Sequence, residues 1–498
     1  MISRRHFLGS TAAALAVPLS SARVAAAQGD LRNLMMRTDG LGLAQMVKAG
    51  EVSPLELAET AINAALALDG NLNALTTPMY EQALARAAVM RPQGPFAGVP
   101  FAVKDNLDVA GQYTTHGSRV YQDNYQHYSA PLALAQEAAG FNLIGKTNMP
   151  EVGAIPTTEG QLLEPCCNPW NLDHSTGGSS GGSAAVVAAG IVPVAHASDG
   201  GGSIRIPAAS CGVFGLKPSR RRMVWGSSDQ TTYAVDNCVS RSVRDSAMLF
   251  ALGQDRSPTA PFAPLPFVSG PSSNRLTIGF DLRNYYGNLP DPDVQRAIEQ
   301  MAQLCADLGH TVIETTNPVD DEFELRFNQI FGFRMVGLAD AATAKAGRPP
   351  SETGLLDTFV MQWAEAARQF TPEDVAAANA YMQKLGSDYQ AWLSGMDVFL
   401  SPVLMGTAPR LGTLYDPGKS FEEMFGRITN YASFTAVQNA IGLPGMSVPA
   451  GLGSDGLPIG SHFVAPAGRE DILFALAYEL EQAKPWWDSW APMSLTRL

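Results

Sequence analysis

Two serine clusters lie close together in one glycine-rich stretch, residues 177–205, which reads GGSSGGSAAVVAAGIVPVAHASDGGGSIR. Glycines at this density cost backbone entropy on folding, so they need a reason. One reason is to point several backbone N–H groups at one place beside a serine. A nucleophile next to a pocket for negative charge is what an acyl-transfer enzyme needs. The stretch therefore predicts nucleophilic chemistry at an acyl group.

A second motif, at residues 140–147, matches the phosphate-binding pattern GxxxxGK[ST]. That pattern works through an open glycine-rich loop that runs into a helix. Here the four middle residues favour a strand, and Asn148-Met149-Pro150 follows in place of a helix. We interpret the segment as a core strand with Lys146 at its end.

A third motif, GxSxG at residues 177–181, matches the nucleophile elbow of Ser-His-Asp hydrolases. An elbow needs a buried strand directly before it, but residues 168–176 predict a polar loop. The histidines that could serve as the base are His196, His310 and His462, and nothing around them favours one of the three. We therefore expect the seven histidines to be ordinary polar residues.

The chain resembles the amidase signature family. The resemblance is carried by GGSSGGSA at 177–184, SDGGGSIRIPA at 198–208 and CGVFGLKP at 211–218. This combined motif is far longer than a lone GxSxG. Within the family, Thr157-Thr158-Glu159 and Gly468-Arg469-Glu470-Asp471 are similar to bacterial enzymes that open cyclic nylon-type amides.

The resemblance implies a catalytic triad. Ser203 falls at the nucleophile, Ser179 at a bridging serine whose peptide bond is typically cis in the family, and Lys104 at the base. The chemistry is consistent, since a serine hydroxyl is a poor nucleophile until its proton is removed. A lysine can remove that proton only when it is neutral, and burial lowers its pKa in that direction. The alternative for Lys104 is a salt bridge with an acid such as Asp105.

The resemblance also assigns the loop around the nucleophile. The implied oxyanion donors are the backbone N–H groups of Gly200, Gly201, Gly202 and Ser203. The family usually has a larger residue where this chain has Gly200. Asp199 and Arg205 match positions that brace the loop by hydrogen bonds.

The sequence indicates the residues of the substrate pocket less clearly than the catalytic residues. Phe323, Phe327 and Phe331 recur at helical spacing, so Phe327 and Phe331 could wall an apolar acyl pocket or pack within the core. The resemblance to cyclic-amide hydrolases adds Thr157 and Thr158 as candidate pocket residues.

We expect a serine hydrolase that cleaves a carboxamide C–N bond of a small molecule through an acyl-enzyme, without metal or cofactor. The same site could also cleave esters or carbamates. Two alternatives stay open, namely an amidotransferase-type amidase subunit and a non-catalytic small-molecule-binding protein of the same fold.

The elements that must position these residues alternate between helix and strand, which argues for an α/β fold. Ser53-Pro54-Leu55-Glu56 predicts a capped helix start, with Gly70 as the end of that helix. Residues 100–105 read as a buried strand that ends in polar residues. We expect one domain over residues 28–498, with a mixed central β-sheet covered by helices on both faces. Residues of about 315–395 are mostly helical and could form a lid or subdomain.

The N-terminal residues are predicted to be an export signal and not part of the folded domain. Arg4-Arg5 followed by an apolar run and by Ala25-Ala26-Ala27 resembles a cleavable twin-arginine signal over residues 1–27. The alternative is a disordered tail. We expect a periplasmic or secreted protein that has no membrane anchor after cleavage.

The composition of the chain limits the kinds of binding partner to be expected. The chain has 498 residues, 46% of them hydrophobic, and a net charge of −13, which argues against nucleic acid and anionic membrane surfaces as partners. We expect a monomer or homodimer. Five cysteines without metal-ligand spacing predict plain thiols, with a vicinal Cys166–Cys167 disulfide as the alternative.

Overall fold

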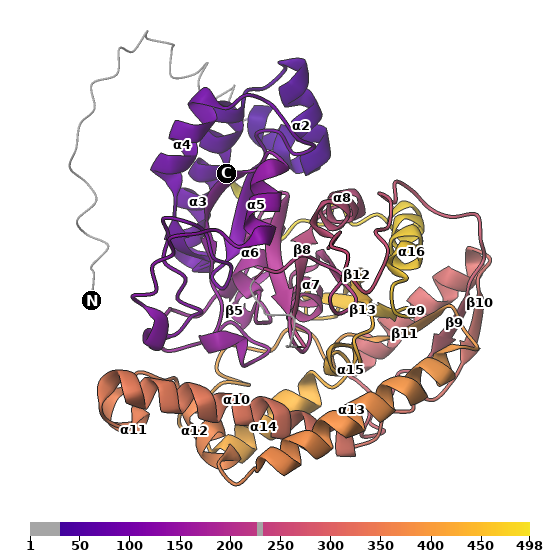
Figure 1. The fold of residues 1–498 in the computed structure, drawn as a ribbon. Helices are drawn as coiled ribbons and strands as arrows, with labels where there is room; N and C mark the ends of the chain where they lie inside the picture. The colour runs from indigo at the N-terminus through magenta and orange to yellow at the C-terminus, as the bar shows by residue number, and fades with distance from the viewer. Residues whose placement is uncertain (1–29, 227–232) are drawn as a thin grey trace.

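The computed structural model of the chain describes residues 30–226 and 233–498. The predicted export signal, residues 1–27, lies outside the described residues. Figure 1 shows the described part as a central twisted sheet with helices packed around it.

An 11-stranded mixed sheet forms the centre of the part of the chain that the structure describes. Its strands, in spatial order, are β1 (Leu75–Pro78), β3 (Asn142–Thr147), β2 (Pro100–Lys104), β6 (Val194–Asp199), β8 (Val235–Ser240), β7 (Phe214–Lys217), β12 (Gly445–Leu452), β13 (Pro458–Val464), β11 (Val398–Pro402), β9 (Thr277–Phe280) and β10 (Thr311–Glu314). The β2 pairings with β3 and β6 are parallel, as are the β9 pairings with β10 and β11, and the other pairings are antiparallel. Every residue of β2 and β6 is buried, as expected for strands covered on both faces.

Ten helices pack on this sheet in the part of the chain that the structure describes. They are α2 (Gly40–Ala49), α3 (Pro54–Leu72), α4 (Tyr80–Val89), α5 (Pro131–Ala138), α6 (Gly181–Ala188), α7 (Arg205–Cys211), α8 (Val243–Gly253), α9 (Pro292–Asp307), α15 (Ala436–Ile441) and α16 (Glu470–Ala483). One apolar cluster packs α3, α4 and α6 against the β2–β6 region. A second packs α8, α9 and α16 against β11, β12 and β13. The predicted α/β fold in a single domain, with a mixed sheet and helices, is confirmed.

The segment predicted to be mostly helical consists of α10 (Glu322–Ala346), α11 (Pro350–Thr353), α12 (Thr358–Ala367) and α13 (Pro372–Leu393). Together with α14 (Phe421–Tyr431) these helices form a layer along one side of the molecule (Figure 1). α10 contacts both α12 and α13, and α12 contacts α14. The long helix α10 carries the three phenylalanines singled out in the sequence.

One predicted boundary is wrong. α3 starts as expected, because Ser53 and Glu56 form a capping box ahead of Pro54. It does not end at Gly70 but runs on to Leu72, and Asn73 ends it in the left-handed conformation with φ 49°. The Asp69 carboxylate accepts hydrogen bonds from the backbone N–H groups of residues 74 and 75. This side chain therefore turns the chain into β1 without a glycine.

The segment with the phosphate-binding pattern is a strand, as predicted. Residues 142–147 form β3, and Lys146 is fully buried near its end. The Lys146 ammonium lies 2.9 Å from the Asp105 carboxylate and donates to the Tyr113 carbonyl and the Thr114 hydroxyl, each at 2.8 Å. Fully buried and held by these three contacts, Lys146 is not available to a phosphate.

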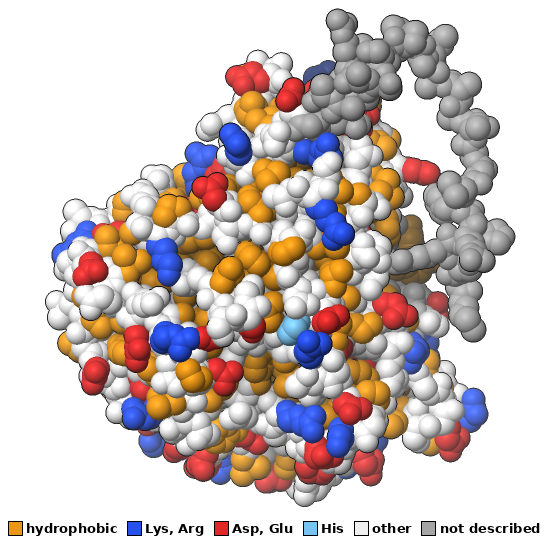
Figure 2. Space-filling model, turned by 180° about the vertical axis from the view of Figure 1, so that it is seen from behind, with side chains coloured by type: hydrophobic (Ala, Val, Ile, Leu, Met, Phe, Trp, Pro, Cys, Tyr) orange, Lys and Arg blue, Asp and Glu red, His pale blue; other side chains and the backbone are white. Residues whose placement is uncertain are grey.

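The five cysteines are free thiols, in agreement with the prediction. In residues 30–226 and 233–498 there is no helix long and apolar enough to cross a membrane, and no cluster of His, Cys, Asp and Glu side chains suited to a metal ion. On the face seen in Figure 2, the described acidic and basic side chains are interspersed.

Candidate active site

The serine clusters are positioned by β6 and by the turns at its ends. β6 lies beside β2 in the sheet and runs parallel to it, with Ala102 opposite Ala195. Because the strands are parallel, Lys104 at the end of β2 and Asp199 at the end of β6 emerge at the same edge. In α/β sheets this edge is where ligands bind.

Lys104 is almost completely buried at this edge, with 1% of its surface exposed. Its Nζ donates to the Ser179 hydroxyl at 2.7 Å and to the Ser198 hydroxyl at 3.0 Å. Burial lowers the pKa of Lys104 to about 7, and the carboxylates of Asp236 and Asp199 oppose that shift. A lysine with such a pKa has a substantial neutral fraction near neutral pH, so its nitrogen can accept a proton.

The structure decides against the alternative for Lys104. Asp105 forms its ion pair with Lys146 of the neighbouring strand, not with Lys104. The two buried lysines therefore lie in different environments. Lys146 faces a carboxylate, whereas Lys104 faces two serine hydroxyls.

Ser179 lies in a closely packed turn. The Gly178–Ser179 peptide bond is cis, as the family resemblance implied. A Cβ atom at Gly178 would lie 2.4 Å from the Thr157 carbonyl oxygen, so only glycine fits there. The neighbouring Ser180 donates to the Ser198 carbonyl at 3.0 Å, which is a role within the fold.

Ser179 and Ser203 both line one cavity of about 430 Å³, and Lys104 lines it too. Much of the remaining wall is apolar and comes from Met149, Ile155, Ile206, Phe323, Phe327, Phe331, Met335 and Trp363. A serine–serine–lysine group thus opens into a largely apolar space large enough for a small molecule.

The glycine loop before Ser203 contributes fewer N–H groups than predicted. The Gly202 N–H donates to the Asp199 carboxylate at 2.7 Å, which removes it from the predicted set of oxyanion donors. The N–H groups of Gly200, Gly201 and Ser203 have no acceptor among the described residues, and all three residues line the cavity. They are the donors that this loop can offer to an oxyanion.

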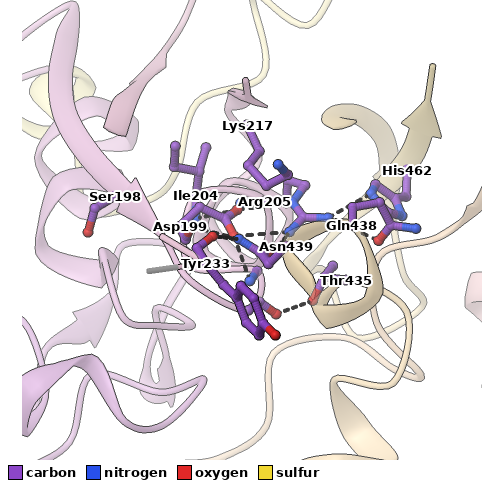
Figure 3. A network of polar contacts seen from close by, with 12 residues as sticks. Ser198, Asp199, Ile204, Arg205, Lys217, Tyr233, Thr435, Gln438, Asn439 and His462 are labelled. Carbon is purple, nitrogen blue, oxygen red and sulfur yellow. Dashed lines mark hydrogen bonds and ion pairs between the residues drawn. The ribbon is translucent and has the colours of Figure 1, made fainter. Parts of the chain in front are cut away.

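A buried polar network holds this loop in place (Figure 3). The fully buried Arg205 donates through Nε and Nη2 to the two Asp199 carboxylate oxygens, both at 3.0 Å. Burial would raise the pKa of Asp199, but the Arg205 guanidinium outweighs burial and holds that pKa below its ordinary value. Nη2 of Arg205 also donates to Asn439 at 2.7 Å. Asn439 in turn donates to the Asp199 carbonyl at 2.7 Å.

A second contact anchors the loop to the C-terminal part of the chain. The Thr435 hydroxyl donates to the Gly201 carbonyl at 2.7 Å. Figure 3 shows Thr435 and Asn439 coming from one helical segment that faces the Asp199–Arg205 pair. Residues more than 200 positions away therefore fix the loop that carries Ser203.

The predicted pocket residues divide into two groups. Phe327 and Phe331 both line the cavity, and their rings stack at 4.2 Å. Thr157 and Thr158 are not among the described residues that line it. The Thr158 hydroxyl donates to the Gly177 carbonyl and accepts from the Gly181 N–H, so it supports the serine turn from behind.

Among the polar residues of the cavity that sequence reasoning missed are Ser198, Asn106 and His116. Ser198 shares Lys104 with Ser179 and also accepts a hydrogen bond from Asn106 at 2.9 Å. His116 lines the cavity, and burial, with the nearby Lys146 charge, lowers its pKa to about 4, so its ring is neutral. Ser198 could have been suspected, since it precedes Asp199 in the motif, but nothing local marks Asn106 or His116. The described lining includes none of His196, His310 and His462.

Known proteins resemble this chain over most of its length. A profile of the amidase family, described as "Amidase", matches residues 56–474. A 6-aminohexanoate-cyclic-dimer hydrolase of Paenarthrobacter ureafaciens is 35% identical over 475 residues, covering 90% of this chain and 95% of the relative. A putative amidase AmiC of Mycobacterium tuberculosis is 33% identical over 458 residues, with the same 90% and 95% coverage.

A solved structure of 6-aminohexanoate cyclic dimer hydrolase, complexed with substrate, superposes with a TM-score of 0.85 and 31% sequence identity. The match covers 92% of this chain and 99% of that chain. The similarity therefore extends over nearly the whole described fold.

Proposed function

The chain belongs to the amidase family of hydrolases that act on amide bonds, and from this premise we propose that Ser203 is its nucleophile, Ser179 its proton relay and Lys104 its base. The observation that carries the proposal is the 2.7 Å hydrogen bond from Lys104 Nζ to Ser179 Oγ in a cavity that Ser203 also lines. A lysine whose pKa lies near 7 is suited to general base catalysis at neutral pH.

Acylation begins with neutral Lys104. As the Ser203 oxygen attacks the substrate carbonyl carbon, the Ser203 proton passes to Ser179 while the Ser179 proton passes to Lys104. The carbonyl oxygen becomes negatively charged in the tetrahedral intermediate. The N–H groups of Gly200, Gly201 and Ser203 stabilise that charge, and each such donor typically accounts for about 100–1000-fold in rate.

Collapse of the intermediate breaks the C–N bond. The proton returns from Lys104 through Ser179 to the departing nitrogen, which leaves as a neutral amine. Water then attacks the acyl–Ser203 ester, losing its proton through Ser179 to Lys104. The second tetrahedral intermediate collapses by breaking the bond from the acyl carbon to Ser203 Oγ, and Oγ takes the proton back from Lys104 through Ser179. The products are a carboxylic acid and an amine, and the three residues have regained their starting protonation.

The substrate class follows from the cavity and the relatives. The wall is largely apolar, which favours carboxamides with apolar parts over highly polar ones. Two of the compared relatives are named as hydrolases of a cyclic dimer of 6-aminohexanoate, so cyclic amides belong in a substrate screen. Esters and carbamates belong there as well, because the same attack applies to their carbonyl groups.

The decisive experiment is a hydrolysis screen of primary amides, anilides, cyclic amides, esters and carbamates with wild type and Ser203→Ala. We expect Ser203→Ala to retain only a trace of wild-type turnover and to lose labelling by a fluorophosphonate probe. The matched control is Ser257→Ala, which changes an exposed serine and should keep both properties. Full turnover by Ser203→Ala would refute the assignment.

We also propose that residues 1–27 direct export through the twin-arginine route. Support comes from Arg4-Arg5, the apolar run after them and the small residues at 25–27. Fractionation of cells should find the wild-type protein in the periplasm or medium, and the double variant Arg4→Lys, Arg5→Lys in the cytoplasm. Arg23→Lys is the control and should be exported. Identical localisation of the double variant and wild type would contradict the proposal.

A further inference from the structure

One charged side chain of the cavity has no role in the proposed chemistry. Glu324, in the first turn of α10, lines the cavity. Among the described lining residues it is the single carboxylate. A carboxylate inside an apolar cavity is costly unless something compensates it.

Glu324 forms no ion pair in the part of the chain that the structure describes: in residues 30–226 and 233–498 no lysine or arginine pairs with it. It is half-buried, and burial raises the pKa of its carboxyl group. The site thus holds a partly buried carboxyl group that has no ion-pair partner among the described residues.

A helix-capping role does not account for this placement. Acidic residues in a first helical turn interact favourably with the helix dipole. Glu322 occupies the same turn at the surface, however, and binds Arg326 at 2.7 Å and 2.9 Å. The exposed Glu322 therefore already provides the favourable interaction with the helix dipole, whereas Glu324 lines the cavity.

The surroundings of Glu324 also suit a cation. Tyr285 also lines the cavity. Burial, and to a smaller extent the Glu324 charge, raises the pKa of its phenol. Tyr285 packs edge-on against Phe323 at 5.6 Å. Ammonium groups bind well where a carboxylate and aromatic faces meet, because both attract positive charge.

The position of Glu324 relates it to the reacting centre. Glu324 and Phe327 are three residues apart, so they share one face of α10. The Phe327 Cζ atom lies 3.5 Å from where a Cβ atom would stand on Gly201 of the oxyanion loop. The carboxylate is thus about one helical turn from the ring that faces the loop.

The cavity lining also includes Arg334, ten residues further along α10 (334 − 324), or about 15 Å along the helix axis. Its guanidinium lies over the Phe331 ring at 5.2 Å. Glu324 and Arg334 therefore occupy different parts of the cavity.

We infer that Glu324 forms a cation subsite, and that the preferred substrates are amides carrying an ammonium group separated from the scissile bond by an apolar linker. The inference rests on the proposed function in that it assigns substrate class at the same site. Glu324 is assigned to binding and selectivity, not to the bond-breaking steps.

The test uses two matched substrate series. In one, the acyl half of a p-nitroanilide ends in an ammonium, a methyl or a carboxylate group, with linkers of increasing length. In the other, the same three ends stand on the amine half of a simple amide. For wild type we expect kcat/KM for the ammonium compound to exceed that for the methyl compound by about tenfold or more in one series.

Three variants decide the origin of such a preference. Glu324→Gln should bring the ratio of ammonium to methyl compound close to one, and Glu324→Lys should shift preference to the carboxylate compound. Glu322→Gln, a matched change in the same turn, should keep the wild-type ratio. Melting temperatures identify any variant that has lost its fold. The inference is overturned if wild type shows no preference in either series, or if Glu324→Gln keeps the preference.

A binding measurement separates this inference from the proposed function. Calorimetry on the Ser203→Ala protein measures the affinities for hexylammonium and for hexanol, and it does so without turnover. The subsite is supported if hexylammonium binds more tightly than hexanol and if the added Glu324→Gln change removes this difference. This holds even if no amide is hydrolysed. Equal binding of both ligands overturns it even if hydrolysis depends on Ser203.

Discussion

The ammonium nitrogen of Lys104 lies 2.7 Å from the hydroxyl oxygen of Ser179, although 75 residues separate them in the chain. The contact forms because β2 ends beside β6, next to the turn that precedes α6. It joins Lys104, whose pKa of about 7 lets it take up a proton near neutral pH, to the serine cluster. The first two predictions concern this pair.

Replacing Lys104 by alanine should lower kcat/KM by about 10²–10⁴, the usual contribution of a general base. Lys104→Arg should not restore activity, because a guanidinium stays protonated at any accessible pH. Steady-state kinetics on an anilide would measure both effects. The exposed Lys384→Ala is the control and should behave as wild type. Rescue by arginine would mean that Lys104 is needed only for its charge.

The pH dependence follows from the form of Lys104 that is active. Burial lowers the pKa of Lys104 to about 7, and in the proposed mechanism the neutral amine is the base. The neutral fraction grows as pH rises, so kcat/KM should increase about tenfold per pH unit below that pKa and level off above it. A pH–rate profile with an uncharged substrate checks this. A profile that falls as pH rises through neutrality would contradict the assignment of Lys104 as base.

The Asp199–Arg205 pair should be important for stability. Asp199→Ala leaves the fully buried Arg205 without its carboxylate and frees the Gly202 N–H. Removing one partner of a buried ion pair typically costs about 3–5 kcal/mol. Asp173→Ala breaks an exposed pair with Arg410, whose side chains are 70% and 69% exposed, and should cost about 1 kcal/mol or less. Urea unfolding of both variants makes the comparison, and equal losses would contradict it.

Alanine substitutions at Gly200 and at Gly202 of the loop should have very different effects on kcat/KM. A Cβ atom at Gly200 would have Ala234 Cβ at 3.7 Å as its nearest contact, which is ordinary packing. At Gly202, φ is +133° and a Cβ atom would lie 2.2 Å from the Thr435 hydroxyl oxygen. We therefore expect Gly200→Ala to cost little in melting temperature and kcat/KM. Gly202→Ala should lose about 100-fold or more in kcat/KM, because the loop that presents oxyanion donors must move. Similar effects of the two changes would show that the loop tolerates such movement.

Much of this protein was readable from the order of its residues. The alternation of helices and strands predicted the α/β fold, and the capping signal at Ser53 predicted a helix start. The long glycine–serine motif indicated the family and the candidate triad. These features were accessible because each depends on residues close together in the sequence.

Other features depend on which strands and helices become neighbours. Lys104 and Asp105 are adjacent in sequence, yet Asp105 meets Lys146 from β3 while Lys104 meets Ser179, because successive side chains leave an extended chain on opposite sides. The Gly202 N–H could be assigned to Asp199 only once the loop conformation was known.

The substrate cavity is the clearest case. Thr157 and Thr158 looked like pocket residues but lie behind the serine turn. Nothing local in the sequence marked Glu324, which lines the cavity together with Thr429, more than a hundred residues later. The sequence by itself determined the fold class and the reaction chemistry, since both are encoded locally. Only the tertiary structure decided what surrounds the reacting groups, because contacts between distant segments leave no local pattern.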